Sequence, residues 1–328
     1  MTHAATLTLA DLEAAARKID GTARRTPLLE LEPNLYAKAE NLQLTGSFKL
    51  RGAYNFLASL PEAVRARGVV AHSSGNHAQG VACAAKLFGV PATIVIPQNA
   101  APIKVVRTLA WGAEVVRCEN SSTAREAVAR EIAETHGATL VPPFDHPWIV
   151  AGQGTVGLEI AHDLPDVANV LVCVGGGGLL AGITTALRAL CPQAQVIGVE
   201  PELAADAQAS LAAGTVQRWD AALTARTVAD GVRTQHLGAL PFEIIRRGVA
   251  GIVTVSETEI LAATRWYLED AKLVAEPTGA LTLAAYWKLK GGTHQGVTLQ
   301  PGPTALIVSG GNLEPARLLE LFGGEAGD

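Results

Sequence analysis

The stretch Ser47-Phe48-Lys49-Leu50-Arg51-Gly52 is the most informative segment of this chain, and it follows the strand-like segment 35–41. Residues 45–47, Thr-Gly-Ser, form a turn-and-cap signal of the kind that opens a helix. A lysine amine at a helix start meets unfavourable positive potential, and apolar neighbours further disfavour its charge. Both effects lower the pKa of Lys49 and leave a neutral nucleophile suited to an aldehyde. Taken alone, the segment is also compatible with a solvated surface lysine.

A second motif, Ser73-Ser74-Gly75-Asn76-His77-Ala78-Gln79-Gly80, joins the end of an apolar strand-like run to the start of a helix. Backbone amides at such a turn, together with two hydroxyl groups, favour the binding of an anion. The alternative interpretation is a Ser/Asn helix cap that binds no ligand.

A third motif, Gly175-Gly176-Gly177-Gly178-Leu179, also follows a strand and opens a helix. Residues without side chains let consecutive N–H groups approach a phosphate, and the helix dipole adds favourable potential. The same segment supports a nicotinamide-cofactor dehydrogenase, because residues 176–181 fit G-x-G-x-x-A and Glu200 ends the next strand, where a ribose ligand should fall. That alternative leaves the first two motifs unexplained.

Together the three motifs resemble those of the pyridoxal-phosphate enzymes of the tryptophan-synthase-β type, specifically the serine/threonine dehydratase and serine racemase branch. The resemblance extends along essentially the whole chain. It implies an α/β fold of two open twisted-sheet domains, with pyridoxal 5'-phosphate as the cofactor. It implies that Lys49 forms the internal Schiff base, and that the cofactor is bound by Phe48, Lys49, Asn76, Gly175, Gly176, Gly177, Gly178, Leu179 and Ser309.

The resemblance also assigns roles within the second motif. The substrate carboxylate is expected at Ser73, Ser74, Gly75, Asn76 and His77. Asn76 matches the asparagine that contacts the phenolic oxygen of the cofactor. Ser74 matches the serine that serine racemases use as an acid/base on the ring face opposite the lysine, so Lys49 and Ser74 are the expected catalytic residues.

Residues 309–312, Ser-Gly-Gly-Asn, follow the last apolar strand. In the resembled family a serine at this place hydrogen-bonds the pyridine nitrogen, and Ser309 matches it. A neutral hydroxyl leaves that nitrogen largely unprotonated, so the ring is a weaker electron sink than one paired with aspartate. Such a ring suits elimination better than transamination. Without the resemblance, an ordinary strand-to-loop turn would explain the segment.

Residues 200–206, Glu-Pro-Glu-Leu-Ala-Ala-Asp, place two carboxylates six positions apart after a strand. Oxygen ligands of this kind suit Mg²⁺, Mn²⁺ or Ca²⁺. In serine racemase-like members of the family, the residues that match Glu200, the Ala204 carbonyl and Asp206 hold a divalent cation. The alternative is that these acidic residues only decorate the first turn of a helix.

The composition is that of an ordinary globular chain of 328 residues, 48% hydrophobic and 17% charged. The formal net charge is −5, so the chain lacks the excess of basic residues typical of nucleic-acid-binding proteins, and no nucleic-acid partner is expected. Four scattered cysteines predict buried thiols in a reducing compartment. The uncharged segment 167–187 contains four consecutive glycines and is interpreted as a buried strand and helix, not a membrane span. A cytoplasmic protein is expected, with no membrane partner.

Alternating helical and apolar strand-like segments predict two α/β domains. Four short strands between residues 69 and 141 describe a small parallel sheet, and the Pro-rich segment 142–147 resembles a boundary. The predicted small domain spans residues 53–147. Residues 1–52 and 148–328 are expected to form the large cofactor-binding domain, because the resembled family threads its chain in that way. The cofactor is expected in the cleft at the carboxyl ends of the strands.

The activity implied by the resemblance is deamination of a small β-hydroxy amino acid, most of all L-threonine or L-serine, to a 2-oxo acid and ammonia. Serine racemase and 3-hydroxyaspartate dehydratase are the alternatives within the family, and the nicotinamide-dependent dehydrogenase is a distant one. A small amino-acid substrate is the expected partner, and a homo-oligomer, dimer or tetramer, is expected.

Overall fold

The computed structural model describes residues 7–314, except 74, 99, 101 and 120. Its larger sheet has six strands in the order β1-β2-β10-β7-β8-β9. All neighbouring pairs are parallel except β1 with β2. The strands are β1 (Leu28–Glu32), β2 (Leu35–Ala39), β7 (Asn169–Cys173), β8 (Gln195–Pro201), β9 (Gly251–Val255) and β10 (Thr304–Val308).

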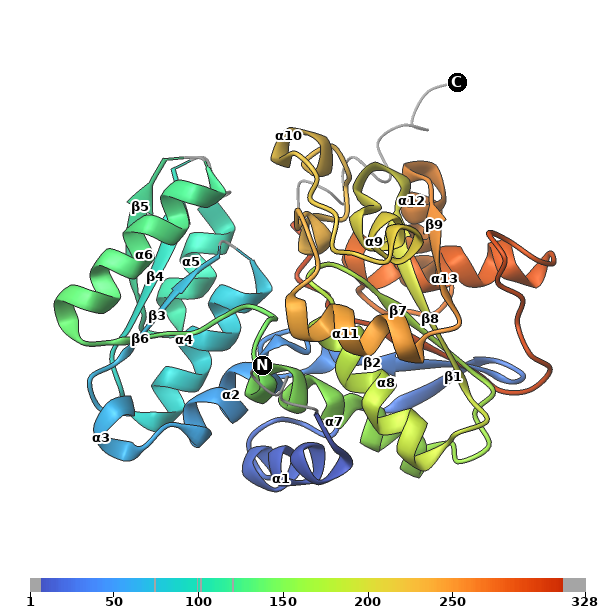
Figure 1. Ribbon diagram of the computed structural model, residues 1–328, viewed down its shortest axis with the longest axis horizontal. Coiled ribbons are helices and arrows are strands. Elements are labelled where there is room, and N and C mark those ends of the chain that lie inside the picture. The colour runs from blue at the N-terminus through green and yellow to red at the C-terminus, as the bar shows by residue number, and fades with distance from the viewer. Residues whose placement is uncertain (1–6, 74, 99, 101, 120, 315–328) are drawn as a thin grey trace.

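The smaller sheet has four parallel strands in the order β5-β4-β3-β6. They are β3 (Val69–His72), β4 (Ala92–Pro97), β5 (Glu114–Cys118) and β6 (Thr139–Leu140). Figure 1 shows this sheet with its helices on the left and the larger sheet on the right. The α/β class and the parallel pairing of four short strands, both predicted from the alternating pattern, are confirmed.

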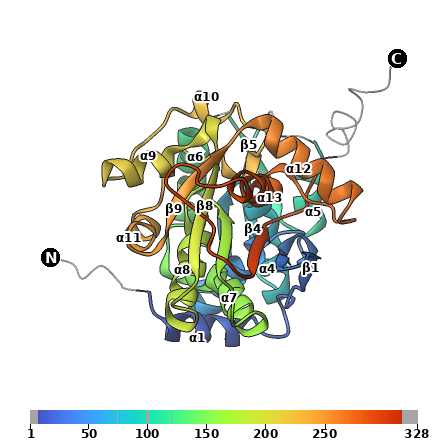
Figure 2. The same ribbon diagram turned by 90° about the vertical axis from the view of Figure 1, so that its right-hand side faces the viewer.

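Helices connect the parallel strands, as parallel pairing requires. The α-helices are α1 (Leu9–Ile19), α2 (Lys49–Ser59), α3 (Glu62–Arg65), α4 (Asn76–Phe88), α5 (Pro102–Ala110), α6 (Ser122–His136), α7 (Pro147–Asp163), α8 (Gly178–Leu190), α9 (Asp206–Ala213), α10 (Ala221–Thr224), α11 (Ala239–Gly248), α12 (Glu257–Glu269) and α13 (Pro277–Lys290). Short 3₁₀ turns are η1 (Glu40–Leu42), η2 (Glu202–Ala204) and η3 (Asp230–Val232). Figure 2 looks from the side of the larger sheet, with α8, α12 and α13 in front.

The start of α2 differs from the prediction that a serine cap opens this helix. Gly46 does make the predicted turn, with φ +73°. Ser47 instead forms an extended bridge with Gly310, and Phe48 donates its backbone N–H to the Ser309 carbonyl at 3.1 Å. Ser47 is therefore part of an extended bridge, while Phe48 is already helical with φ −56° and ψ −19°, and no side chain among the described residues caps α2. The helix therefore begins at Lys49.

Helices α2 and α7 cross almost backbone to backbone. A Cβ on Gly152 would lie 2.6 Å from the Cα of Gly52, so both positions need glycine. The two helices also run through the predicted domain boundaries near residues 52 and 147, and the boundary positions stay a prediction. Helix α2 precedes the strands of the smaller sheet and helix α7 follows them, so the chain enters and leaves that sheet through these two crossing helices.

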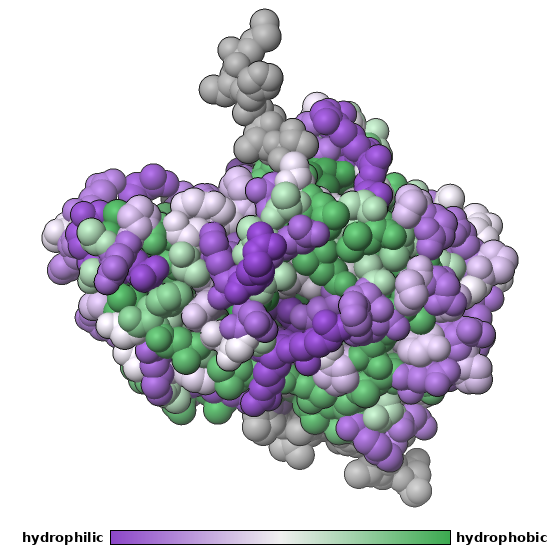
Figure 3. Space-filling model, turned by 90° about the horizontal axis from the view of Figure 1, so that it is seen from below, coloured by the Kyte–Doolittle hydropathy of each residue, from purple (hydrophilic) through white to green (hydrophobic). Residues whose placement is uncertain are grey.

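The four cysteine thiols are free and buried, as predicted. Burial raises their pKa values, to about 12 for Cys83 and about 11 for Cys173, which keeps these thiols protonated. Within the described part of the chain, no helix combines the length and apolar character needed to cross a bilayer. Figure 3 looks onto the α1 side, where strongly hydrophilic residues form a band between apolar patches.

Candidate active site

Lys49 is the first residue of α2, and its side chain is partly buried. The amine donates a hydrogen bond to the carbonyl oxygen of Pro143 at 2.9 Å and lies 5.2 Å from the centre of the Phe48 ring. Burial lowers the pKa of Lys49 to about 8, in the direction predicted from its apolar neighbours. Near neutral pH the amine therefore takes its nucleophilic form far more often than a solvated lysine.

The loop that follows β3 lies against this lysine. A Cβ on Gly80 of α4 would lie 3.0 Å from the backbone carbonyl carbon of Lys49, so glycine permits the close approach. His77 is buried, with Nε2 3.1 Å from the Val141 carbonyl oxygen. Burial, and then the nearby Lys49 charge, lower the pKa of His77 to about 3, so its ring is neutral. Ser73 accepts the Gly75 N–H at 3.2 Å.

Ser74, the expected acid/base, lies outside the described residues. Its role therefore stays a prediction from the resemblance.

Asn76 is held by hydrogen bonds at both ends of its amide. Its nitrogen donates to Glu276 at 2.6 Å, and its oxygen accepts from the Asn312 amide nitrogen at 2.7 Å. Arg107 of α5 in turn donates to Asn312 at 3.3 Å. One N–H of Asn76 is left after the bond to Glu276, and it can donate to the phenolic oxygen expected there.

The four-glycine loop follows β7 and leads into α8. Gly177 has φ +87°, a conformation that strongly favours glycine. A Cβ on Gly176 would lie 2.2 Å from the ring of Phe144, and one on Gly178 would lie 3.1 Å from the Phe144 carbonyl oxygen. The glycines thus allow Phe144 to pack on the loop. This second requirement for glycine at these positions could not be predicted from the sequence. Leu179 is buried in the first turn of α8.

Ser309 follows β10 and is 1% exposed. Its hydroxyl makes no hydrogen bond of normal geometry with the described residues, although the Cys173 thiol is close enough to interact with it. A buried hydroxyl without a proper partner fits a site that receives a ring nitrogen. Cys173 also interacts electrostatically with Lys49, which brings the ends of β7 and β10 and the start of α2 together.

Glu200 and Asp206 are both 1% exposed. Glu200 accepts the backbone N–H groups of Ala207 and Gln208 at 2.9 and 2.8 Å, so both of its oxygens are used to cap α9. This geometry argues against the ribose contact that the dehydrogenase alternative requires of Glu200. Neither carboxylate oxygen of Asp206 has a hydrogen-bond partner among the described residues. Ala204, the third expected ligand, is fully buried at the end of η2.

Burial raises the proton affinity of both carboxylates. Burial raises the pKa of Glu200 well above its usual value, and the neighbouring Asp206 adds to the shift. Burial raises the pKa of Asp206 to about 7. Within the described ranges, no cluster of three or more His, Cys, Asp or Glu residues could hold a metal. A cation at this place would therefore rest on two carboxylates, a backbone carbonyl and water.

Glu276 and Asn312 both contact Asn76. Burial, and then the charge of Asp230, raise the pKa of Glu276 to about 8. A protonated Glu276 keeps one oxygen free to accept from Asn76. The sequence contained a signal for neither contact, because 200 or more residues separate the partners.

Phe144, Thr234 and His236 were not predicted as site residues. The Thr234 hydroxyl is buried without a partner among the described residues and would lie 3.3 Å from a Cβ on Gly175. The ring centres of His236 and Phe144 are 6.4 Å apart. Phe144 and Thr234 thus lie against the glycine loop, and Phe144 follows Pro143, whose carbonyl oxygen accepts from Lys49.

The structure thus gathers an amine of lowered pKa, an anion-binding type of turn, a glycine loop and a buried hydroxyl at the carboxyl ends of β3, β7 and β10. This set fits pyridoxal phosphate: an amine for its aldehyde, N–H groups for its phosphate and a hydroxyl for its ring nitrogen. The arrangement explains all three sequence motifs with one ligand, which a dinucleotide does not.

A family model described as pyridoxal-phosphate dependent enzyme matches residues 19–310. The L-threo-3-hydroxyaspartate ammonia-lyase of Pseudomonas sp is 43% identical, over 96% of this chain and 98% of that protein. A solved threonine deaminase from T.th. is 47% identical with a TM-score of 0.86, over 94% of this chain and 99% of that one. Maize serine racemase is 34% identical with a TM-score of 0.89, over 96% of this chain and 97% of that one.

These matches cover nearly the full chain and include the lysine motif, the Ser73–Gly80 motif and the glycine loop. The chain therefore belongs to the pyridoxal-phosphate-dependent enzymes, in the branch of the serine/threonine dehydratases and serine racemases.

Proposed function

We propose that this enzyme is an ammonia-lyase that converts a small β-hydroxy amino acid, L-threonine or L-serine first of all, to a 2-oxo acid and ammonia. The observation that carries the proposal is the Lys49 amine, which has a pKa of about 8 and donates to the carbonyl oxygen of Pro143, the residue before the Phe144 that packs on the glycine loop. Dehydratases, ammonia-lyases and serine racemases among the relatives support the same class of substrate.

In this mechanism the bound pyridoxal phosphate supplies an electron sink that makes the Cα–H bond of the substrate acidic. Lys49, once released from the cofactor, accepts the Cα proton on its neutral amine. The Ser73–His77 turn holds the substrate carboxylate, and Asn76, fixed by Glu276 and Asn312, donates its remaining N–H toward the cofactor.

The β-hydroxyl would then leave as water, with Ser74 as the residue of this chain placed to supply its proton. The enamine product hydrolyses to the 2-oxo acid and ammonia. Racemisation would share the first proton transfer and differ in reprotonation from the Ser74 face. Because Ser309 offers a neutral hydroxyl to the ring nitrogen, we infer that elimination dominates over transamination.

A second candidate substrate is L-threo-3-hydroxyaspartate, and one observation favours it. Nδ1 of His236 lies 2.8 Å from the Leu237 carbonyl oxygen, so this nitrogen donates its proton to that oxygen. The ring centres of His236 and Phe144 are 6.4 Å apart, and Phe144 packs on the glycine loop. With Nδ1–H used in this way, Nε2 can donate to a second carboxylate on Cβ only in the imidazolium form, and that charged form would bind a carboxylate better than a methyl group.

Steady-state turnover of L-threonine, L-serine, D-serine and L-threo-3-hydroxyaspartate tests the choice of substrate. If His236 binds a β-carboxylate, His236→Gln should lower kcat/KM for hydroxyaspartate at least about tenfold, since a charge-assisted hydrogen bond is lost. The same variant should change kcat/KM for L-threonine less than about threefold. Equal losses on both substrates would contradict a role in specificity. No turnover of any of the four would contradict the proposed function.

We also propose that Glu200, Asp206 and the Ala204 carbonyl bind a divalent cation in a shell completed by water. The unpartnered Asp206 oxygens support this, because a buried carboxylate needs a proton or a cation. Their raised pKa values mean that the folded state holds protons that the unfolded state has lost by neutral pH. Without a cation, this pair should therefore reduce stability progressively as the pH rises toward about 7.

Adding Mg²⁺, Mn²⁺ or Ca²⁺ at millimolar concentration should raise the Tm by about 3 °C or more, because the cation binds only the folded state. The rise should be larger at pH 8 than at pH 5.5, where protons compete for Asp206. Glu200→Gln combined with Asp206→Asn should abolish the rise and leave the colour of the bound cofactor intact. An unchanged Tm in chelator-treated protein after cation addition would leave the pair as helix-cap residues only.

The proposal includes a cytoplasmic location, which the four buried, free thiols support. It also includes a homo-oligomer, a dimer or a tetramer. Exposed apolar side chains on α5, Val106 and Leu109, are consistent with a further contact surface. Sedimentation equilibrium of the cofactor-loaded protein would contradict this part if it gave the mass of a single chain.

A further inference from the structure

Four charged side chains form a buried group behind the lysine helix, here termed the Arg51 cluster: Lys38, Glu40, Arg51 and Glu159. Glu159 is 13% exposed and the other three side chains are at most 1% exposed. Two positive and two negative groups make the cluster neutral. It joins four elements, because its members belong to β2 (Lys38), η1 (Glu40), α2 (Arg51) and α7 (Glu159).

Arg51 uses both edges of its guanidinium in this cluster. Nε and Nη2 donate to the two oxygens of Glu40 at 2.8 and 2.7 Å. Nη1 and Nη2 donate to the two oxygens of Glu159 at 2.6 and 2.9 Å. Further bonds reach the Thr155 hydroxyl and the Arg24 carbonyl oxygen, both at 3.1 Å. All five N–H donors have acceptors, so the orientation of the group is fixed.

Electrostatics agrees with this arrangement. Burial works to raise the pKa of Glu40, but the Arg51 guanidinium outweighs it and lowers that pKa below its usual value. Burial likewise works to lower the pKa of Arg51, and the Glu40 carboxylate raises it above its usual value. Both groups therefore stay charged at neutral pH. Such a buried ion cluster adds little stability compared with apolar side chains of similar volume. Stability alone therefore does not explain the cluster, whereas the fixed geometry of its hydrogen bonds does.

The position of Arg51 on α2 shows what this geometry holds in place. Two residues along an α-helix turn by about 200°, so Lys49 and Arg51 leave the helix on nearly opposite sides. Lys49 reaches the Pro143 carbonyl, while Arg51 reaches Glu40 and Glu159. In the described structure, no side chain caps the first turn of α2. A shift of this turn would move the Lys49 amine, and the Arg51 contacts resist such a shift.

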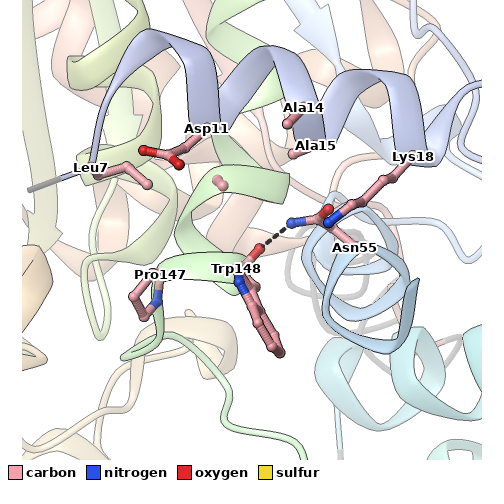
Figure 4. Close-up of a pocket in the computed structure, with 9 residues that line it drawn as sticks. Leu7, Asp11, Ala14, Ala15, Lys18, Asn55, Pro147 and Trp148 are labelled. Atoms are coloured by element: carbon pink, nitrogen blue, oxygen red, sulfur yellow. Dashed lines mark hydrogen bonds between the residues drawn. The ribbon is translucent and has the colours of Figure 1, made fainter. Parts of the chain in front are cut away.

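Later turns of α2 are fastened separately. The Gly52 N–H donates to the Gln153 side-chain oxygen at 3.2 Å, and Asn55 donates to the Trp148 carbonyl oxygen at 2.6 Å. Figure 4 shows the Asn55 bond next to a cavity of about 220 Å³ between α1, α2 and α7. These bonds tie α2 to α7, whereas Arg51 also ties it to the end of β2 through Glu40.

We propose that Arg51 is a positioning residue for Lys49: its bonds to Glu40 and Glu159 fix the first turn of α2, so that the amine is presented to the cofactor aldehyde. This inference concerns the cofactor site itself and stands whichever hydroxy amino acid is the substrate. Lys38 shares Glu159 with Arg51 but has no hydrogen bond to α2 in the described chain; its Nζ donates to Glu159 at 2.5 Å and to the Thr26 carbonyl at 2.6 Å. Lys38 therefore serves as a matched control.

The test compares Arg51→Lys with Lys38→Met. Arg51→Lys keeps the charge but replaces a rigid fork of five donors by three donors on a flexible chain. Both variants should lower the Tm of the cofactor-free protein by several degrees. Arg51→Lys should in addition slow the attachment of pyridoxal phosphate to Lys49 at least about tenfold and lower kcat by a similar factor. The attachment rate is measured by borohydride reduction and peptide mass.

Lys38→Met should change the attachment rate and kcat less than about twofold at temperatures well below its Tm. Glu40→Gln is a milder second variant that keeps Arg51 and removes one charge, and it should slow attachment about threefold or more. An attachment rate in Arg51→Lys equal to that of Lys38→Met would overturn the proposal and leave the cluster purely structural. If Arg51→Lys does not fold, an unchanged attachment rate in Glu40→Gln would overturn it.

Discussion

Replacing Lys49 by alanine is expected to lower ammonia-lyase turnover by at least about 10⁴-fold, because the group that both attaches the cofactor and accepts the Cα proton is lost. The amine is suited to both tasks, since burial brings its pKa to about 8. The Lys49→Ala protein should still bind pyridoxal phosphate through the glycine loop and Ser309. Borohydride should no longer fix the cofactor to the peptide that contains residue 49.

The control for this experiment is Lys86→Ala, which removes an exposed lysine on α4 that lies over the Trp111 ring. It should leave turnover and borohydride fixation unchanged. In the wild-type protein, attachment of added cofactor should accelerate as the pH rises through about 8. The pKa of Lys49 is lowered to about 8, so the fraction of its amine in the neutral, nucleophilic form increases over this range. Turnover by Lys49→Ala within tenfold of wild type would contradict the assignment of Lys49.

Much of this site could be predicted from short segments of sequence. Glycine runs and Ser/Asn turns bind anions through their own backbone, so residues 73–77 and 175–179 carry their chemistry locally. The lowered pKa of Lys49 could also be anticipated, because the apolar residues that bury it are partly its own neighbours in the chain. The bounds of strands β3 and β10 coincide with those of the strand-like runs at residues 69–72 and 304–308.

The remaining parts depend on contacts between distant segments. Ser47 looked like a helix cap, but its bridge to Gly310 of another strand end overrides the local signal. Arg51 and Glu159 resemble ordinary surface charges in the sequence, and only the crossing of α2 and α7 buries them together. Glu276 approaches Asn76 across 200 residues of sequence. Local patterns thus identify the groups that meet the ligand, and tertiary packing decides which groups hold them.

The second large effect is expected at Ser309, where a carboxylate can be tested against the native hydroxyl. Ser309 is 1% exposed and lies close to the Cys173 thiol. An aspartate placed here is desolvated, so it should destabilise the cofactor-free protein and lower its Tm by several degrees. Bound cofactor should restore part of that loss, because a protonated ring nitrogen pairs with the new carboxylate.

With the ring nitrogen protonated, the cofactor becomes a stronger electron sink and elimination loses its advantage over competing reactions at Cα. Ser309→Asp should therefore lower 2-oxo acid formation from L-threonine about 100-fold, shift the visible absorbance of the bound cofactor and increase the fraction of cofactor converted to its amine form. Ser309→Ala, which removes the hydroxyl without adding charge, is the control and should show neither the absorbance shift nor the amine form. If Ser309→Asp kept the spectrum, the rate and the product distribution of wild type, the neutral hydroxyl would not be what directs this site toward elimination.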